Sequence, residues 1–226
     1  MIRVLFLISM LFTVNIFGQS FENFKIGEGA KYFMKTPGSA DAEVSIYFTD
    51  VKKESISVEF FVDAQNTLVP VKLYQQFLLA KKTDGSLMIK EGYFQGQSQK
   101  NPQKMSGESF SNNNGVELND FLFSDEKTLN SALVEAATLK TPAGTLSTNH
   151  YRKSRNNQTV DFWISKEAKP LGLVKLVSTG PKNSNQNYEL ELISLLKNVK
   201  AAINPKDAKE MDAKEKTLIN MPLKWW

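Results

Sequence analysis

The chain holds a single histidine, His150, and no cysteine. A structural or catalytic zinc site of the usual kind needs at least two or three His or Cys ligands, so we predict no metal site. A Ser-His-acid triad needs a serine brought to His150, but no G-x-S-x-G turn is present. We interpret His150 as a strand residue with a hydrogen-bonded ring, and predict no catalytic residue and no cofactor.

Paired carboxylates and a glycosylation signal are the next candidates for chemistry. Glu189 and Glu191 face the same side of an expected strand, an arrangement that glycoside hydrolysis can use. They alternate with Tyr188, Leu190 and Leu192, which favours a solvent-facing role. Asn157-Gln158-Thr159 is a glycosylation site only in a eukaryotic host. An exported hydrolase therefore stays a minor hypothesis, which predicts that His150→Ala abolishes a measurable activity.

Three tryptophans are candidates for binding. Trp163 lies opposite Phe162 in its expected strand, where it either covers a neighbouring strand or lines a binding face. Trp225 and Trp226 end the chain, where they fold back onto the domain, fray, or dock on a membrane or a partner.

The elements that would position these residues are mostly strands with alternating apolar side chains. Asp50–Glu54 is a charged turn between two of them, which predicts a hairpin. Gln75 is the one polar side chain in the inward row of a further strand. The strands are expected around 44–48, 56–62, 69–79, 87–93, 116–123, 145–152, 160–164, 171–178 and 188–192, whereas 21–40 carries little periodicity.

Helical spacing is expected in two places and a loop in a third. Ser124 can cap a helix that runs through Leu129, Leu133 and Ala136 and stops before Thr141. Leu195, Leu196, Val199 and Ile203 follow helical spacing to Pro205. The polar stretch Gln95–Gly115 predicts a mobile loop, either a hairpin tip or a lid over a cavity.

The N-terminal residues have the layout of a secretory signal peptide, with Arg3 before an apolar run that ends at Gly18. The run is shorter than a membrane span needs, so we expect a protein that is periplasmic or secreted, with no stable membrane span. We predict a leader at 1–18, a β-rich domain at 19–205 and a charged helical tail at 206–226. A net charge of +4 with interleaved signs gives no nucleic-acid footprint.

Five segments in the second half of the chain follow one another as expected for consecutive hairpin strands and their turns: Thr141–Thr145, His150–Arg152, Val160–Ser165, Lys169–Lys175 and Tyr188–Leu192. It resembles the closing hairpins of the outer-membrane lipoprotein carrier superfamily and related exported bacterial proteins. The resemblance covers about a third of the mature chain and contains no catalytic signature. It implies a curved antiparallel half-barrel that wraps a helix and holds acyl chains on an apolar concave face.

We therefore predict a β-rich α+β fold, a curved antiparallel sheet wrapping one or two helices. The expected function is a non-enzymatic exported binding protein that shields a lipid or acyl chain in the cell envelope. The alternative is a subunit of an envelope or surface assembly that docks on a protein partner through the tail and Trp225-Trp226. The expected ligand-binding residues on the apolar sheet face are Val58, Phe60, Val71, Leu73, Phe77, Trp163 and Leu173.

Overall fold

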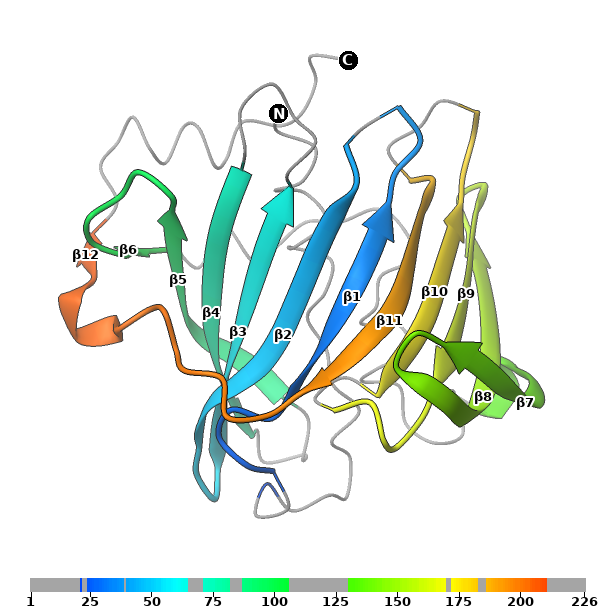
Figure 1. Ribbon diagram of the computed structural model, residues 1–226, viewed down its shortest axis with the longest axis horizontal. Helices are drawn as coiled ribbons and strands as arrows, with labels where there is room; N and C mark the ends of the chain where they lie inside the picture. Colours follow the sequence, from blue (N-terminus) through cyan, green and yellow to red (C-terminus); the bar gives the residue numbers. More distant parts are fainter. Residues whose placement is uncertain are drawn as a thin grey trace.

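A single curved sheet organises the part of the chain that is described. The computed structural model describes residue 21 and residues 24–38, 40–64, 71–81, 87–105, 130–169, 172–182 and 186–210. Within these ranges twelve strands join in the order β12-β6-β5-β4-β3-β2-β1-β11-β10-β9-β8-β7 (Figure 1). The strands are β1 (Gly29–Lys35), β2 (Ala42–Val51), β3 (Ser55–Ala64), β4 (Val71–Lys81), β5 (Leu87–Gly96), β6 (Gln103–Lys104), β7 (Leu133–Thr141), β8 (Gly144–Arg155), β9 (Gln158–Ile164), β10 (Leu173–Thr179), β11 (Tyr188–Leu196) and β12 (Lys209–Glu210).

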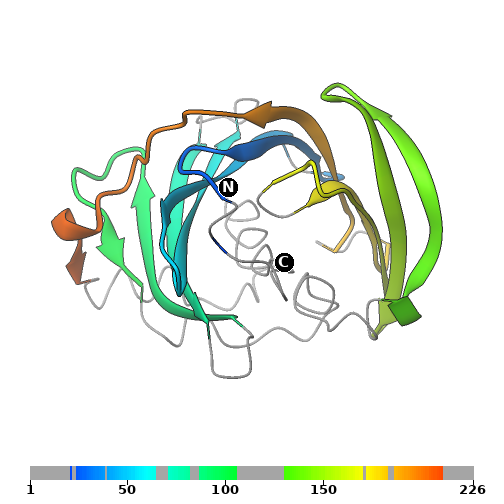
Figure 2. The same ribbon diagram turned by 90° about the horizontal axis from the view of Figure 1, so that it is seen from below.

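Neighbouring strands pair antiparallel, except for the short parallel pair β12–β6. β1 lies in the middle of the sheet, between β2 and β11, and so joins the two halves of the chain. Seen along its strands, the sheet bends into an arch with a concave and a convex side (Figure 2).

The hydrophobic core lies on the concave side of the arch, because apolar side chains alternate along β1–β4 and β9–β11 and point inward. Close packing inside the sheet is clearest at Gly29. A Cβ atom there would lie 2.3 Å from the carbonyl oxygen of Ile46 and 2.5 Å from the Cβ of Tyr47. Only glycine allows β1 and β2 to approach this closely.

After β11 the chain crosses the convex side of the arch to reach the far edge of the sheet (Figures 1 and 2). We call this segment, residues 197–208, the strap. It contains one short 3₁₀ turn, η3 (Pro205–Asp207), and leads into β12. Lys209 N donates to Pro102 O, and Asn101 Nδ2 donates to Asp207 O, so the end of the strap is tied to the edge of the sheet.

The β-rich prediction is confirmed, and the strands expected at 44–48, 56–62, 145–152, 160–164 and 188–192 are present. The wrapped helices are not confirmed. The helix expected from Ser124 to Thr141 is wrong over its second half, because Leu133–Thr141 forms β7 and pairs with β8. The helix expected at 195–203 is also wrong, because Leu195 and Leu196 are the end of β11 and residues 197–203 form an irregular segment held by contacts to the sheet.

Residues 21–40 carry more structure than expected. Ala30, Tyr32 and Met34 are the buried side of β1. Phe33 is an apolar residue on the opposite side of β1, so apolar and polar side chains alternate less clearly and the strand is difficult to recognise in the sequence. The expected leader, the strand at 116–123 and residues 106–115 of the expected loop lie outside the described residues. In the described part of that loop, β5 ends at Gly96 and β6 forms at Gln103–Lys104.

Among the described residues, no helix has the length and apolar content to cross a membrane.

Candidate functional site

The concave side of the sheet carries a continuous set of buried apolar side chains. Val44, Ile46 and Phe48 of β2 point to it together with Phe60 of β3 and Phe162 of β9. We call this surface the concave face. Its other inward-pointing side chains on β1, β3, β4, β9, β10 and β11 are Ala30, Tyr32, Met34, Ile56, Val58, Val62, Leu73, Phe77, Leu79, Val160, Leu176, Leu190 and Leu192.

Most of the residues predicted to bind a ligand do lie in this core. Val58, Phe60, Phe77 and Leu173 are exposed by 1% or less, and Leu73 by 3%. Val71 is partly buried and packs against the same cluster. Phe60 and Phe77 meet edge to face, with ring centroids 6.2 Å apart. A ligand that reached these side chains would therefore have to displace existing packing.

Gln75 interrupts the concave face. It is 4% exposed, and its strand partners are Phe60 on β3 and Phe94 on β5. Its Oε1 atom is buried and has no hydrogen-bond partner. An unpaired buried amide oxygen costs about 1–3 kcal/mol, so this position is energetically unusual.

Trp163 corrects the predicted set, because it does not lie on the concave face. Side chains alternate along β9, so Phe162 points inward and Trp163 points to the other side. There its ring stacks on His150, with centroids 4.3 Å apart and planes 8° from parallel. Trp163 covers a neighbouring strand, one of the two roles considered for it.

His150 belongs to a charged cluster on β7, β8 and β9. Its Nε2 lies 2.7 Å from Asp161 Oδ1, and Arg152 Nε donates to the same oxygen over 2.7 Å. Its Nδ1 is buried without a hydrogen-bond partner, and the closest carboxylate oxygen belongs to Glu135, 3.9 Å away. This arrangement places carboxylates near both ring nitrogens, which differs from a nucleophile–histidine–acid relay.

Glu189 and Glu191 lie on the same side of the sheet as Trp163, as their alternation with Leu190 predicts. Glu189 pairs with Lys175 over 2.7 Å, and both side chains are partly exposed. No set of three His, Asp or Glu residues able to hold a metal ion occurs in the described parts of the chain.

The convex side carries a buried carboxylate that the sequence did not reveal. Glu59 is fully buried, and four donors surround it. Oε1 accepts from Tyr47 Oη at 2.5 Å and from Ala202 N at 2.8 Å. Oε2 accepts from Ile203 N at 3.0 Å and from Gln76 Nε2 at 3.1 Å. We call this group of contacts the Glu59 clamp.

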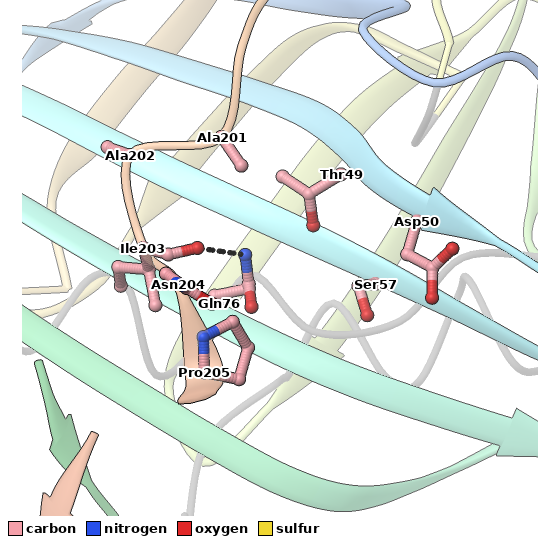
Figure 3. A pocket seen from close by; sticks show the side chains of 9 residues that line it. All are labelled: Thr49, Asp50, Ser57, Gln76, Ala201, Ala202, Ile203, Asn204 and Pro205. Atoms are coloured by element: carbon pink, nitrogen blue, oxygen red, sulfur yellow. Dashed lines mark hydrogen bonds between the residues drawn. The ribbon is translucent and has the colours of Figure 1, made fainter. Parts of the chain in front are cut away.

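The Glu59 clamp fastens the strap to the sheet. Gln76 Nε2 also donates to Ile203 O over 3.3 Å, so both polar backbone groups of Ile203 are bound (Figure 3). Burial, and then the neighbouring Glu59 carboxylate, raise the pKa of Tyr47 well above its usual value. The Tyr47 hydroxyl therefore stays protonated and keeps donating to Glu59.

A pocket of about 340 Å³ lies between the strap and strands β2, β3 and β4 (Figure 3). Its walls are a mixture of polar and apolar groups, and the buried Oγ1 of Thr49 has no hydrogen-bond partner. The nine lining residues are Thr49, Asp50, Ser57, Gln76, Ala201, Ala202, Ile203, Asn204 and Pro205.

The outer edge of β7 is exposed. It is the last strand at its end of the sheet, and no other strand in the described ranges pairs with that edge. Leu133 and Val134 are 44% and 48% exposed. Trp225 and Trp226, predicted to dock on a partner, lie outside the described residues.

Comparison with known proteins gives only distant likenesses. No family model matches the chain, and no curated protein matches it. The hypothetical protein CT021 from Chlamydia trachomatis matches 82% of this chain and 96% of its own, with a TM-score of 0.44 and 9% identity. A protein described as "a putative lipoprotein" from Parabacteroides distasonis matches 78% of this chain and 98% of its own, with a TM-score of 0.38 and 11% identity. Similarity at this level identifies neither a family nor a function for this chain.

Proposed function

We propose that this protein is an exported, non-enzymatic binding protein that shields an apolar ligand, a lipid or acyl chain, against the concave face. The observation that carries the proposal is the continuity of that face, which apart from Gln75 is apolar from β4 across the middle of the sheet to β9. Each methylene transferred from water to such a surface contributes about 0.8 kcal/mol, so affinity would come from contact area.

The burial of the concave face adds a kinetic expectation. Since Val58, Phe60 and Phe77 are almost inaccessible, a ligand can reach them only after packing has opened. Because binding requires a conformational change, the association rate should be lower than at a preformed site and should level off at high ligand concentration.

The direct test is native mass spectrometry of the mature protein purified from its own host, followed by extraction of the released small molecules. A discrete added mass that releases a lipid supports the proposal and names the ligand class. The contrary result is a bare protein that, after delipidation, binds neither a fatty acid nor a phospholipid in a calorimetric titration.

The second candidate is an interaction subunit of an envelope or surface assembly, and the exposed edge of β7 favours it. An unpaired edge offers backbone donors and acceptors to an added strand, and edges without protection are used in this way. Leu133 and Val134 would add apolar contact at one end of that edge.

Two variants separate the two docking routes. Leu133→Lys with Val134→Lys puts charge at the β7 edge, and deletion of 211–226 removes the tail with Trp225 and Trp226. The deletion begins at 211 because Lys209 is hydrogen-bonded to the sheet. Loss of partner capture from a lysate in the first variant alone supports docking at β7, and loss in the deletion alone supports docking through the tail. Full capture by both variants contradicts this second candidate.

A further inference from the structure

Gln75 stands where packing alone would place an apolar residue. The inward row of β4 is Val71, Leu73, Gln75, Phe77 and Leu79, and the row is otherwise aliphatic or aromatic. Nothing in the described structure pairs with the Gln75 Oε1 atom, and the residue is 96% buried. A leucine of similar size would fill this position without a desolvated polar atom.

Unsatisfied buried polar atoms are few in folded proteins, and each one calls for a physical reason. The Glu59 clamp shows that this sheet can satisfy a buried polar group completely, since the clamp has four donors on one carboxylate. Gln75 lies on the opposite side of β4 from Gln76, facing Phe60 and Phe94, and lacks any such arrangement.

We infer that Gln75 is a recognition residue of the concave face, whose amide oxygen accepts a hydrogen bond from the bound ligand. The inference rests on the proposed function and narrows its ligand class. The ligand is an apolar molecule with a hydrogen-bond donor, a hydroxyl or an amide N–H, attached to its hydrocarbon part. An ionised fatty acid or a simple ester offers only acceptors and leaves this oxygen unpaired.

The test uses two isomeric probes of equal size, dodecan-1-ol, which has a hydroxyl donor, and undecyl methyl ether, which has none, titrated calorimetrically into delipidated mature protein. A hydrogen bond to a desolvated partner is worth about a factor of ten in affinity at most sites of this kind. Wild type should bind the alcohol about tenfold more tightly than the ether. Gln75→Leu should bind the two probes within a factor of two of each other, and still bind the ether.

Gln97→Leu is the matched control, since it makes the same chemical change at an exposed residue beyond the end of β5. It should keep the wild-type preference. Equal affinity of wild type for both probes, or tighter binding of the ether, overturns the inference while the proposed function stands. Failure of both probes to bind wild type overturns the proposed function itself.

The stability of Gln75→Leu without ligand tests the inference independently of the affinity for the two probes. Without ligand, Gln75→Leu should raise the urea midpoint, because it removes an unpaired polar atom from the core. A lower midpoint would show that the amide is structurally paired, which overturns a role in recognition.

Discussion

The Glu59 clamp gives the sharpest prediction about how this fold is held together. Glu59→Gln keeps the size of the side chain but replaces one acceptor oxygen by an NH₂ group. The new amide can take two orientations, and the less damaging one places its NH₂ group at the position of Oε1. The Tyr47 hydroxyl, which donates to Oε1 in the wild type, can then rotate and accept a hydrogen bond from the NH₂ group. The backbone N–H of Ala202 cannot do so and loses its partner.

The cost can be worked out from these contacts. One buried N–H left unpaired costs about 1–3 kcal/mol. The other contacts weaken as well, since hydrogen bonds to a charged acceptor are worth about 1.5–3 kcal/mol each and those to a neutral acceptor about half of that. Adding the unpaired N–H to the two weakened contacts of Oε2, we expect Glu59→Gln to lower the free energy of unfolding by about 2.5–6 kcal/mol.

Urea denaturation gives the free energy, and amide hydrogen exchange shows where the loss arises. The amides of Ala202 and Ile203 should lose protection before those of β2 and β3. Glu189→Gln is the control, because it removes an exposed pair with Lys175 and should change stability by less than about 1 kcal/mol. Unchanged stability of Glu59→Gln with unchanged protection of both strap amides would refute the reasoning.

Three further predictions concern packing, charge and pH. Gly29→Ala should lower the free energy of unfolding by about 2 kcal/mol or more, because the new Cβ would lie 2.3 Å from Ile46 O. Gly96→Ala, with its closest contact at 3.6 Å, is the control in the same urea titration and should stay within about 1 kcal/mol of wild type. Asp161→Asn should cost about 1–2 kcal/mol in thermal denaturation at neutral pH, since it weakens the contacts of one oxygen with both His150 and Arg152; a variant as stable as wild type would contradict that role. Burial raises the pKa of Tyr188 to about 12, so its protonated form stabilises the fold below pH 10 and this contribution is lost as the pH rises from 10 to 12. Tyr188→Phe should therefore show a shallower decline of urea midpoint over that range, and an identical decline would count against this assignment.

The alternation of apolar and polar side chains predicts most strands of the sheet correctly. It does not identify a strand whose two sides have the same surroundings. β2 and β3 were predictable because Val44, Ile46 and Phe60 face a core while their neighbours do not. The sequence predicts a helix at β7 because Leu, Ala, Glu and Lys are good helix formers, and the strand buries no regular face that would mark it, since most of its side chains are exposed. Its strand conformation comes from pairing with β8, a tertiary contact that overrides local propensity.

The wrong prediction of a helix in the strap has a related physical reason. Ile203 is 2% exposed, and its spacing from Leu196 and Val199 imitates one face of a helix. Its burial comes from the sheet beneath it, through the Glu59 clamp. The clamp itself could not be predicted, because Glu59 and Ile203 are 144 positions apart and a polar residue on the outward side of a strand normally meets water. On the concave side, by contrast, Gln75 was visible in the sequence as an exception within its row.

The central place of β1 has a consequence for how the chain folds. β2–β5 and β8–β11 can each form through pairing of strands that are neighbours in sequence, but the two sets join only when Gly29–Lys35 meets β11. That step closes a loop of about 160 residues, and such non-local pairing makes folding slow. Until β11 arrives, β1 is an open edge that can pair with other chains, and the strap, which follows β11, is not yet held against β3 and β4. We therefore expect folding to be limited by this single closure, with aggregation as the competing process during synthesis or export.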